Sequence, residues 1–233
     1  NYKFSRFNIK AAAVFQNQYR SSGPLGSKML EYSRDAVLPE MFAGIDYRKD
    51  GFIVGVGADV LTLTPRTQST KGELTYKVSE RNVSASLLAF ASYSSEWWKL
   101  NAKTIYGQNN VHTLSLGGYG VTSIDPVTGA YDYVNFNHST SWVNVVYGKK
   151  WQVGLFGGFT KNLGTNKPLV SSSMTYGMGM DIDKLYNMSV QTDYNIKNFT
   201  IGVEYSYSVA DYGTIQTTTG KVTKDRKSTR LNS

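Results

Sequence analysis

Cysteine is absent from this chain of 233 residues. Its absence excludes disulfide bonds, cysteine-ligated metal sites and a cysteine nucleophile. Long apolar runs are absent as well, since no stretch approaches the roughly 18 consecutive apolar residues of a membrane-spanning helix. A helical membrane protein is therefore excluded, whereas a β-barrel is not, because a barrel strand needs only one apolar face.

Proline and histidine are scarce, with 5 and 2 residues, whereas the chain has 22 Gly, 17 Tyr, 10 Phe and 4 Trp. This composition favours strands and turns over helices. A zinc site needs three or four ligands, and no others are apparent beside His112 or His138. His138 and Ser139 are adjacent, so in a strand they point to opposite faces and cannot act as a dyad. We expect no metal, no cofactor and no enzymatic activity.

The formal net charge is +8, which is often a sign of nucleic-acid binding. The charges are scattered along the chain rather than clustered, so we expect no nucleic-acid partner. The segment 225–233 resembles the conceptual translation of a sequencing-library adapter. We therefore expect one domain over 1–224, followed by a tail that is not native. The chain opens directly in strand-like sequence, and we expect a signal peptide upstream of it.

Strict alternation of apolar and polar residues is the main signal in the chain. Between Phe199 and Val209, every odd position is apolar or aromatic, and every even position is Thr, Gly, Glu or Ser. Tyr186–Ile196 follows the same rule, and only Lys197-Asn198 separates the two segments, so they form a hairpin. Further alternating segments bring the expected count to nine strands and the start of a tenth.

The connections alternate in length. Short turns fall at Asp50-Gly51, Ser94–Glu96, Gly148–Lys150 and Lys197-Asn198. Long polar loops lie between them, at Ser21–Asp35, Arg66–Ser79, Gln108–Tyr133, Asn162–Met180 and Asp211–Gly220. This order is typical of outer-membrane barrels, which have short periplasmic turns and long external loops. The sequence therefore predicts an all-β fold, an antiparallel up-and-down transmembrane β-barrel, incomplete and part of a larger barrel.

Aromatic residues gather at the predicted strand ends, mostly beside the short turns. Such rings favour the membrane-water boundary, so we predict an aromatic girdle there. Its members are Tyr47, Tyr93, Trp97, Trp98, Tyr147, Trp151, Tyr194 and Phe199. Tyr19 lies at a strand end too.

Two stretches resemble a known family. The first includes Gly117–Val121, Asp132–Asn137, Tyr147–Trp151 and Thr160–Gly164, and the second includes Tyr176–Gly179 and Asp181–Asp183. Together they are similar to porins of Bacteroidota outer membranes, mainly over Trp98–Tyr212. The resemblance implies a single-chain antiparallel barrel, larger than this piece, that passes small solutes.

If the apolar face meets lipid, the charged residues of the other face line the lumen. These are Arg6, Lys10, Asp46, Arg48, Asp59, Lys99, Lys103, Asp193 and Glu204. The basic members suggest a mild preference for anions. We expect a porin of a Gram-negative outer membrane, with lipid and small solutes or ions as partners and a homotrimer as a candidate assembly.

Two alternatives remain. One is a soluble or cell-surface all-β binding module, of the carbohydrate-binding or adhesin-like kind. The other is a slice of a gated outer-membrane transporter barrel.

Overall fold

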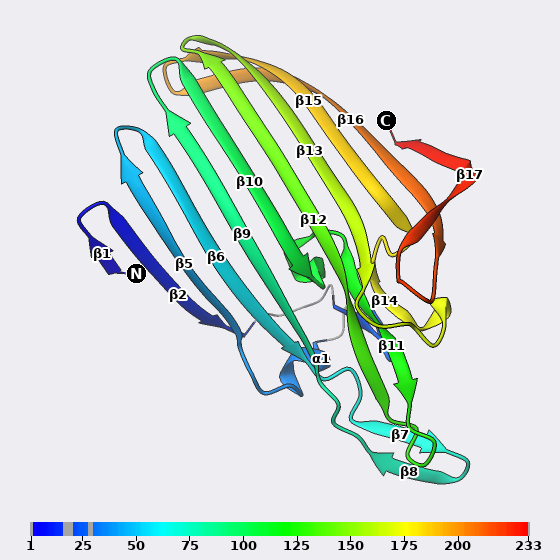
Figure 1. Ribbon diagram of the computed structural model, residues 1–233. Helices are drawn as coiled ribbons and strands as arrows, with labels where there is room; N and C mark the ends of the chain where they lie inside the picture. Colours follow the sequence, from blue (N-terminus) through cyan, green and yellow to red (C-terminus); the bar gives the residue numbers. More distant parts are fainter. Residues whose placement is uncertain (1, 16–20, 28–29, 233) are drawn as a thin grey trace.

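The computed structural model describes residues 2–15, 21–27 and 30–232. Its main feature is one curved sheet of long antiparallel strands that follow one another in chain order (Figure 1). The path through this sheet runs β1 (Tyr2–Phe4), β2 (Phe7–Val14), β5 (Glu40–Lys49), β6 (Phe52–Leu63), β9 (Asn82–Ser94), β10 (Trp98–Gln108), β12 (Tyr131–Gly148), β13 (Trp151–Thr165), β15 (Ile182–Ile196), β16 (Phe199–Ile215) and β17 (Val222–Asn232). Every pair is antiparallel, so the all-β, up-and-down prediction is confirmed.

The path has one strand more than predicted. The additional strand is β1, which pairs with β2 across a turn at Ser5, where φ is 53°. Three residues are too few to show an alternating pattern, which is why the sequence did not reveal it. The strand at the other end of the path, β17, contains most of the predicted tail. Ser233 lies outside the described residues. The division of the chain at residue 224 stays a prediction.

The short turns predicted at Asp50-Gly51, Ser94–Glu96, Gly148–Lys150 and Lys197-Asn198 lie at one end of the sheet, and the longer connections lie at the other end (Figure 1). In the turn between β5 and β6, Asp50 and Gly51 both have positive φ, 47° and 83°. This is the conformation of a type I′ hairpin turn, which suits the twist of the flanking strands. At Gly51 a β-carbon would lie 2.3 Å from the carbonyl oxygen of Ser94, so only glycine fits.

The long connections are more ordered than the polar loops that the sequence predicts. They contain β3 (Ser22–Gly23), β4 (Gly26–Ser27), α1 (Glu31–Arg34), β7 (Gln68–Lys71), β8 (Leu74–Lys77), the 3₁₀ turn η1 (Asn110–Thr113), β11 (Gly117–Ile124), η2 (Ser172–Met174) and β14 (Thr175–Met178). β12 also begins before its predicted limit, because β11 pairs with its first residues and satisfies their backbone groups. β13 runs on to Thr165 by pairing with β12. The sequence predicted long polar loops here and did not reveal the short strands within them.

The buried apolar residues lie where these connections pack on the sheet. One cluster joins Tyr32 and Tyr119 to Leu61 and Leu63 of β6. Two smaller clusters, around Ile182 and around Phe136, involve the ends of β15 and β12. The core thus belongs to the long-loop end, and no second sheet covers the middle of the strands in the described chain. No helix among these residues is long and apolar enough to cross a membrane.

Candidate functional site: a two-faced wall and the loop folded onto it

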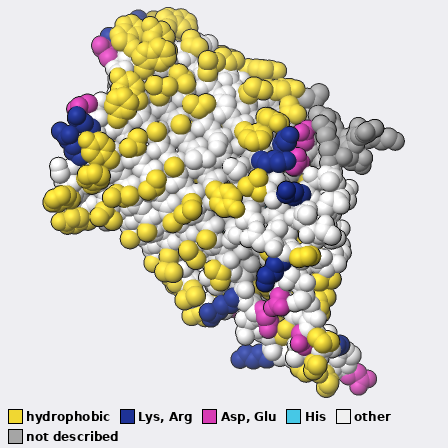
Figure 2. Space-filling view, viewed as in Figure 1, with side chains coloured by type: hydrophobic (Ala, Val, Ile, Leu, Met, Phe, Trp, Pro, Cys, Tyr) yellow, Lys and Arg dark blue, Asp and Glu magenta, His cyan; other side chains and the backbone are white. Residues whose placement is uncertain are grey.

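One face of the sheet, the apolar face, carries large hydrophobic side chains that nothing covers. Cross-strand pairing aligns Leu155 of β13 with Val190 of β15, and Val190 with Tyr205 of β16. Their exposed fractions are 57%, 45% and 68%. Figure 2 shows hydrophobic side chains spread across this face, with charged residues only at its margins. An apolar surface of this extent requires a partner other than water.

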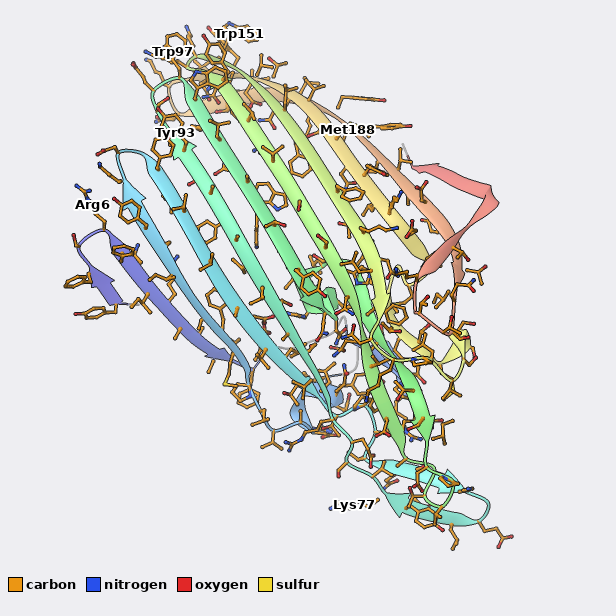
Figure 3. The ribbon with its side chains drawn as sticks, viewed as in Figure 1. Arg6, Lys77, Tyr93, Trp97, Trp151 and Met188 are labelled. Carbon is orange, nitrogen blue, oxygen red and sulfur yellow. The ribbon has the colours of Figure 1, made fainter. Side chains whose placement is uncertain are left out.

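Aromatic rings collect along the short-turn end of the same face. Tyr93, Trp97 and Trp151 lie together there in Figure 3, whereas Met188 lies midway along the strands. The rings also contact one another, since the centroids of Trp98 and Tyr147 are 4.6 Å apart. Trp151 and Tyr194 make an equivalent pair at 4.6 Å.

The other predicted girdle residues lie at this end too. Tyr47 packs against Phe7 of β2 at 5.1 Å, and Phe199 opens β16 just after the Lys197-Asn198 turn. All eight residues are therefore on one rim, and their anchoring role stays a prediction. Tyr19 lies outside the described residues.

The opposite face, the polar face, carries most of the predicted charged residues. Asp46 is the most deeply buried of these charged residues, because its side chain is only 1% exposed. Asp46 accepts hydrogen bonds from Asn8 at 2.8 Å and Arg48 at 2.6 Å, and it pairs with Lys10 at 2.9 Å. Two cations and an amide thus neutralise one buried carboxylate, which is the condition for keeping it there.

The other predicted charges follow the same alternation, with Lys99 and Lys103 on β10, Asp59 on β6, Asp193 on β15 and Glu204 on β16. Arg6 differs from these residues. It lies in the β1–β2 turn, and its guanidinium donates to the Tyr47 hydroxyl at 3.4 Å, so it belongs to the rim (Figure 3).

The polar face also holds a group of aromatic and apolar side chains that a purely polar lumen does not predict. Phe42, Leu88, Phe90 and Trp142 line a hollow of about 470 Å³ with Lys103 among them. The rings lie over glycines: a β-carbon on Gly55 would be 2.5 Å from the Phe90 ring. Phe156 extends the group, 6.1 Å from the Trp142 ring. The glycines of this face, such as Gly55, were the feature of the sequence that could have indicated these rings.

A loop folds onto the polar face between β10 and β11. Asn110 of η1 accepts a hydrogen bond from Ser86 of β9 at 2.7 Å, which fixes the loop to the wall. Two residues later in η1, His112 lies against Glu40 of β5 and Asp59 of β6. Burial lowers the pKa of His112, but the neighbouring carboxylates of Glu40 and Asp59 outweigh burial, so the net pKa lies above its ordinary value.

Sequence reasoning found no further ligand beside either histidine, yet the structure brings two carboxylates to His112. Glu40, Asp59 and His112 are far apart in the chain, and no local pattern joins them. His138 lies in β12 and is 1% exposed, and neither of its ring nitrogens has a hydrogen-bond partner. It alternates with Ser139 along β12, as expected for strand neighbours.

Tyrosine side chains gather around Arg66 at the long-loop end of the sheet. The guanidinium of Arg66 lies 3.4 Å from the centroid of the Tyr131 ring and donates to the Gly129 carbonyl at 2.7 Å. Tyr119 packs edge-on against Tyr133, with ring centroids 5.5 Å apart. Burial raises the pKa of the Tyr119 hydroxyl well above its ordinary value, so it stays neutral and donates to the Ser22 carbonyl.

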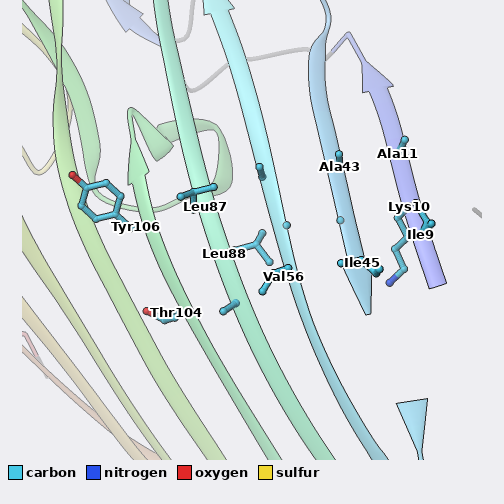
Figure 4. Close-up of a pocket in the computed structure, with 14 residues that line it drawn as sticks. Ile9, Lys10, Ala11, Ala43, Ile45, Val56, Leu87, Leu88, Thr104 and Tyr106 are labelled. Carbon is cyan, nitrogen blue, oxygen red and sulfur yellow. The ribbon is translucent and has the colours of Figure 1, made fainter. Parts of the chain in front are cut away.

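A shallow groove of about 710 Å³ crosses β2, β5, β6 and β9, mostly on the apolar face (Figure 4). Small residues form its floor, with Ala11, Ala43 and Ala58 aligned across three strands. Larger neighbours such as Leu87 and Tyr106 border it. The groove is a thin region of the hydrophobic surface rather than an enclosed cavity.

The sheet is antiparallel and up-and-down, with one uncovered apolar face and an opposite charged face. Its connections alternate in length. Together these features define the fold of outer-membrane β-barrels. Two solved outer-membrane proteins share it. The outer membrane channel DcaP of Acinetobacter baumannii aligns with a TM-score of 0.64 and 15% identity, over 91% of this chain and 55% of that one. OmpT of Vibrio cholerae, folded in vitro, aligns with a TM-score of 0.52 and 10% identity, over 98% of this chain and 59% of that one.

The chain thus spans little more than half the length of these two proteins. No protein-family model matches the chain, and no curated protein does.

Proposed function

We propose that this chain forms the wall of a porin, a channel through which small hydrophilic solutes or ions diffuse across the outer membrane of a Gram-negative bacterium. The observation that carries the proposal is the pairing of an uncovered apolar face with a charged face on the same strands. Lipid would cover the first, and water in the lumen would hydrate the second. The channel described for DcaP supports this assignment through the shared fold.

The two cationic residues of β10 would favour anions in this proposal. Lys99 and Lys103 lie on one strand, two positions either side of Asn101, and no ion pair among the described residues neutralises either of them. Free cationic side chains along a pore raise the local concentration of anions.

Conductance of the full-length protein in a planar lipid bilayer tests the proposal. We expect open channels without added ligand, and a reversal potential that favours anions in a salt gradient. The double variant Lys99→Glu and Lys103→Glu should shift selectivity toward cations. Lys77→Glu is the matched control, because Lys77 ends β8 in the β7–β8 hairpin at the long-loop end, away from Lys99 and Lys103 (Figure 3), and it should leave selectivity unchanged.

The same recording separates the other candidates. A gated transporter barrel would show no steady conductance without an activating partner, and this result would overturn the porin proposal. A soluble binding module would fail to insert, and it would leave the apolar face with its exposed Leu155 and Tyr205 unexplained. We further propose a homotrimer without catalytic activity, and cross-linking in native membranes tests the assembly.

A further inference from the structure

The cluster of His112, Glu40 and Asp59 lies on the polar face, beneath the loop that carries η1. The His112 side chain is 2% exposed, and each carboxylate side chain is 13% exposed. One ligand atom from each residue falls within 4.8 Å of the other two. Two carboxylates in so small a buried volume need positive charge beside them, either a protonated His112 or a bound cation.

One ring nitrogen of His112, Nε2, faces the two carboxylates. Nδ1 is 3.4 Å from the Asn109 carbonyl oxygen, so Nδ1 carries the proton that donates there. Nε2 faces Glu40 at 3.3 Å and Asp59 at 3.9 Å and makes no hydrogen bond of good geometry to either, so in the neutral ring it offers a lone pair to a bound cation. The facing oxygen of Asp59, Oδ2, is also buried without one.

Lone pairs that face one another across 3.3–3.9 Å repel unless a positive centre lies between them. A histidine that donates its other N–H to a backbone carbonyl is the usual arrangement of a metal ligand. Zinc binds nitrogen and carboxylate oxygen at about 2.0–2.2 Å, so tetrahedral ligand atoms are about 3.4 Å apart. The His112–Glu40 distance matches this separation, and the His112–Asp59 distance needs only a small side-chain adjustment.

We propose that His112, Glu40 and Asp59 bind a divalent transition-metal ion of the zinc class. One imidazole nitrogen and two carboxylate oxygens form a mixed donor set that suits zinc better than calcium or magnesium, which prefer oxygen alone. The fourth position would be open to water. The ion would clamp the η1 loop to β5 and β6, in addition to the hydrogen bond between Ser86 and Asn110.

The clamp has a structural consequence for the wall. His112 is 53 residues from Asp59 and 72 from Glu40, so the ion closes two long connections at once. A metal that binds the folded loop and not the unfolded chain stabilises the loop in proportion to its occupancy. The position of η1 over the polar face would then depend on the metal.

Isothermal titration of the chelator-treated full-length protein in detergent, with zinc chloride, tests the site. We expect one zinc ion per chain at micromolar affinity or tighter. His112→Ala and Asp59→Asn should each weaken binding at least tenfold, because each removes one of three ligands. His138→Ala is the matched control, since it removes the other histidine and should bind zinc as the wild type does. Heat-modifiable migration on gels checks that each variant is folded.

A second readout identifies the ligands directly. X-ray absorption at the zinc edge should show a first shell of one nitrogen and oxygens, and the imidazole signal should vanish in His112→Gln. Zinc binding that is absent in the wild type, or equal in wild type and folded His112→Ala, would overturn the proposal. Neither measurement depends on conductance, so the site can fail while the porin proposal stands, and the reverse is also possible.

Discussion

A charge placed on the apolar face gives the most direct test of the two-faced wall. Val190 lies on that face between Leu155 and Tyr205, and its neighbour Gln191 lies on the polar face between Gly154 and Glu204. Val190→Arg puts a cation into lipid, whereas Gln191→Arg puts the same side chain beside Asp193 and Glu204. The two variants differ by one position and share their chemistry.

The depth of Val190 within the membrane sets the expected loss of unfolding free energy. It precedes Ile196, the last residue of β15, by six positions. A rise of about 3.4 Å per residue gives about 20 Å along the strand, and a tilt of about 40° reduces this to about 15 Å above the turn. The apolar band of an outer-membrane barrel is about 25 Å tall, so Val190 lies near its middle. An arginine there costs about 2–4 kcal/mol.

The assay is reversible unfolding of the full-length protein in lipid vesicles, followed by tryptophan fluorescence over a denaturant series. We expect Val190→Arg to lower the folding equilibrium constant by roughly 30- to 700-fold, from about 1.4 kcal/mol per tenfold change. Gln191→Arg should lie within about 0.5 kcal/mol of the wild type, because its side chain stays in the lumen. Equal destabilisation by both variants, or a greater effect at Gln191, would refute the assignment of the faces.

Three further predictions concern the rim and the polar face. Asp46→Asn should lose about 1–3 kcal/mol of unfolding free energy, since Lys10 and Arg48 keep their charges without their carboxylate; an unchanged denaturation midpoint would show that the network contributes nothing. Gly55→Val should lose about 1–3 kcal/mol against the Phe90 ring, and adding Phe90→Ala should recover part of the loss; strict additivity in this double-mutant cycle would contradict the contact. In single-tryptophan variants, lipids brominated near the headgroup should quench Trp151 and spare Trp142, because Trp151 lies on the rim of the apolar face and Trp142 faces the lumen; strong quenching of Trp142 would place it in lipid instead.

Local patterns in the sequence were enough for the strands and their faces. Alternation has a period of two residues, so it can be read within one strand, and it placed Asp46, Lys103 and Glu204 on the face where the structure has them. The Asp50-Gly51 pair indicated its hairpin because a type I′ turn requires positive φ at both positions.

Tertiary structure decided everything that depends on distant segments. The approach of His112 to Glu40 and Asp59 needs the register of β5 with β6 and the fold of the η1 loop, and neither leaves a periodic signal in the sequence. The strands within the long connections, such as β11 and β14, exist because they pair with each other across more than 50 residues. Face assignment is a local property of the backbone, whereas loop contacts depend on which distant groups can satisfy their hydrogen bonds and bury their side chains together. The sequence alone therefore determined the two-faced wall, and only the folded chain determined what lies against it.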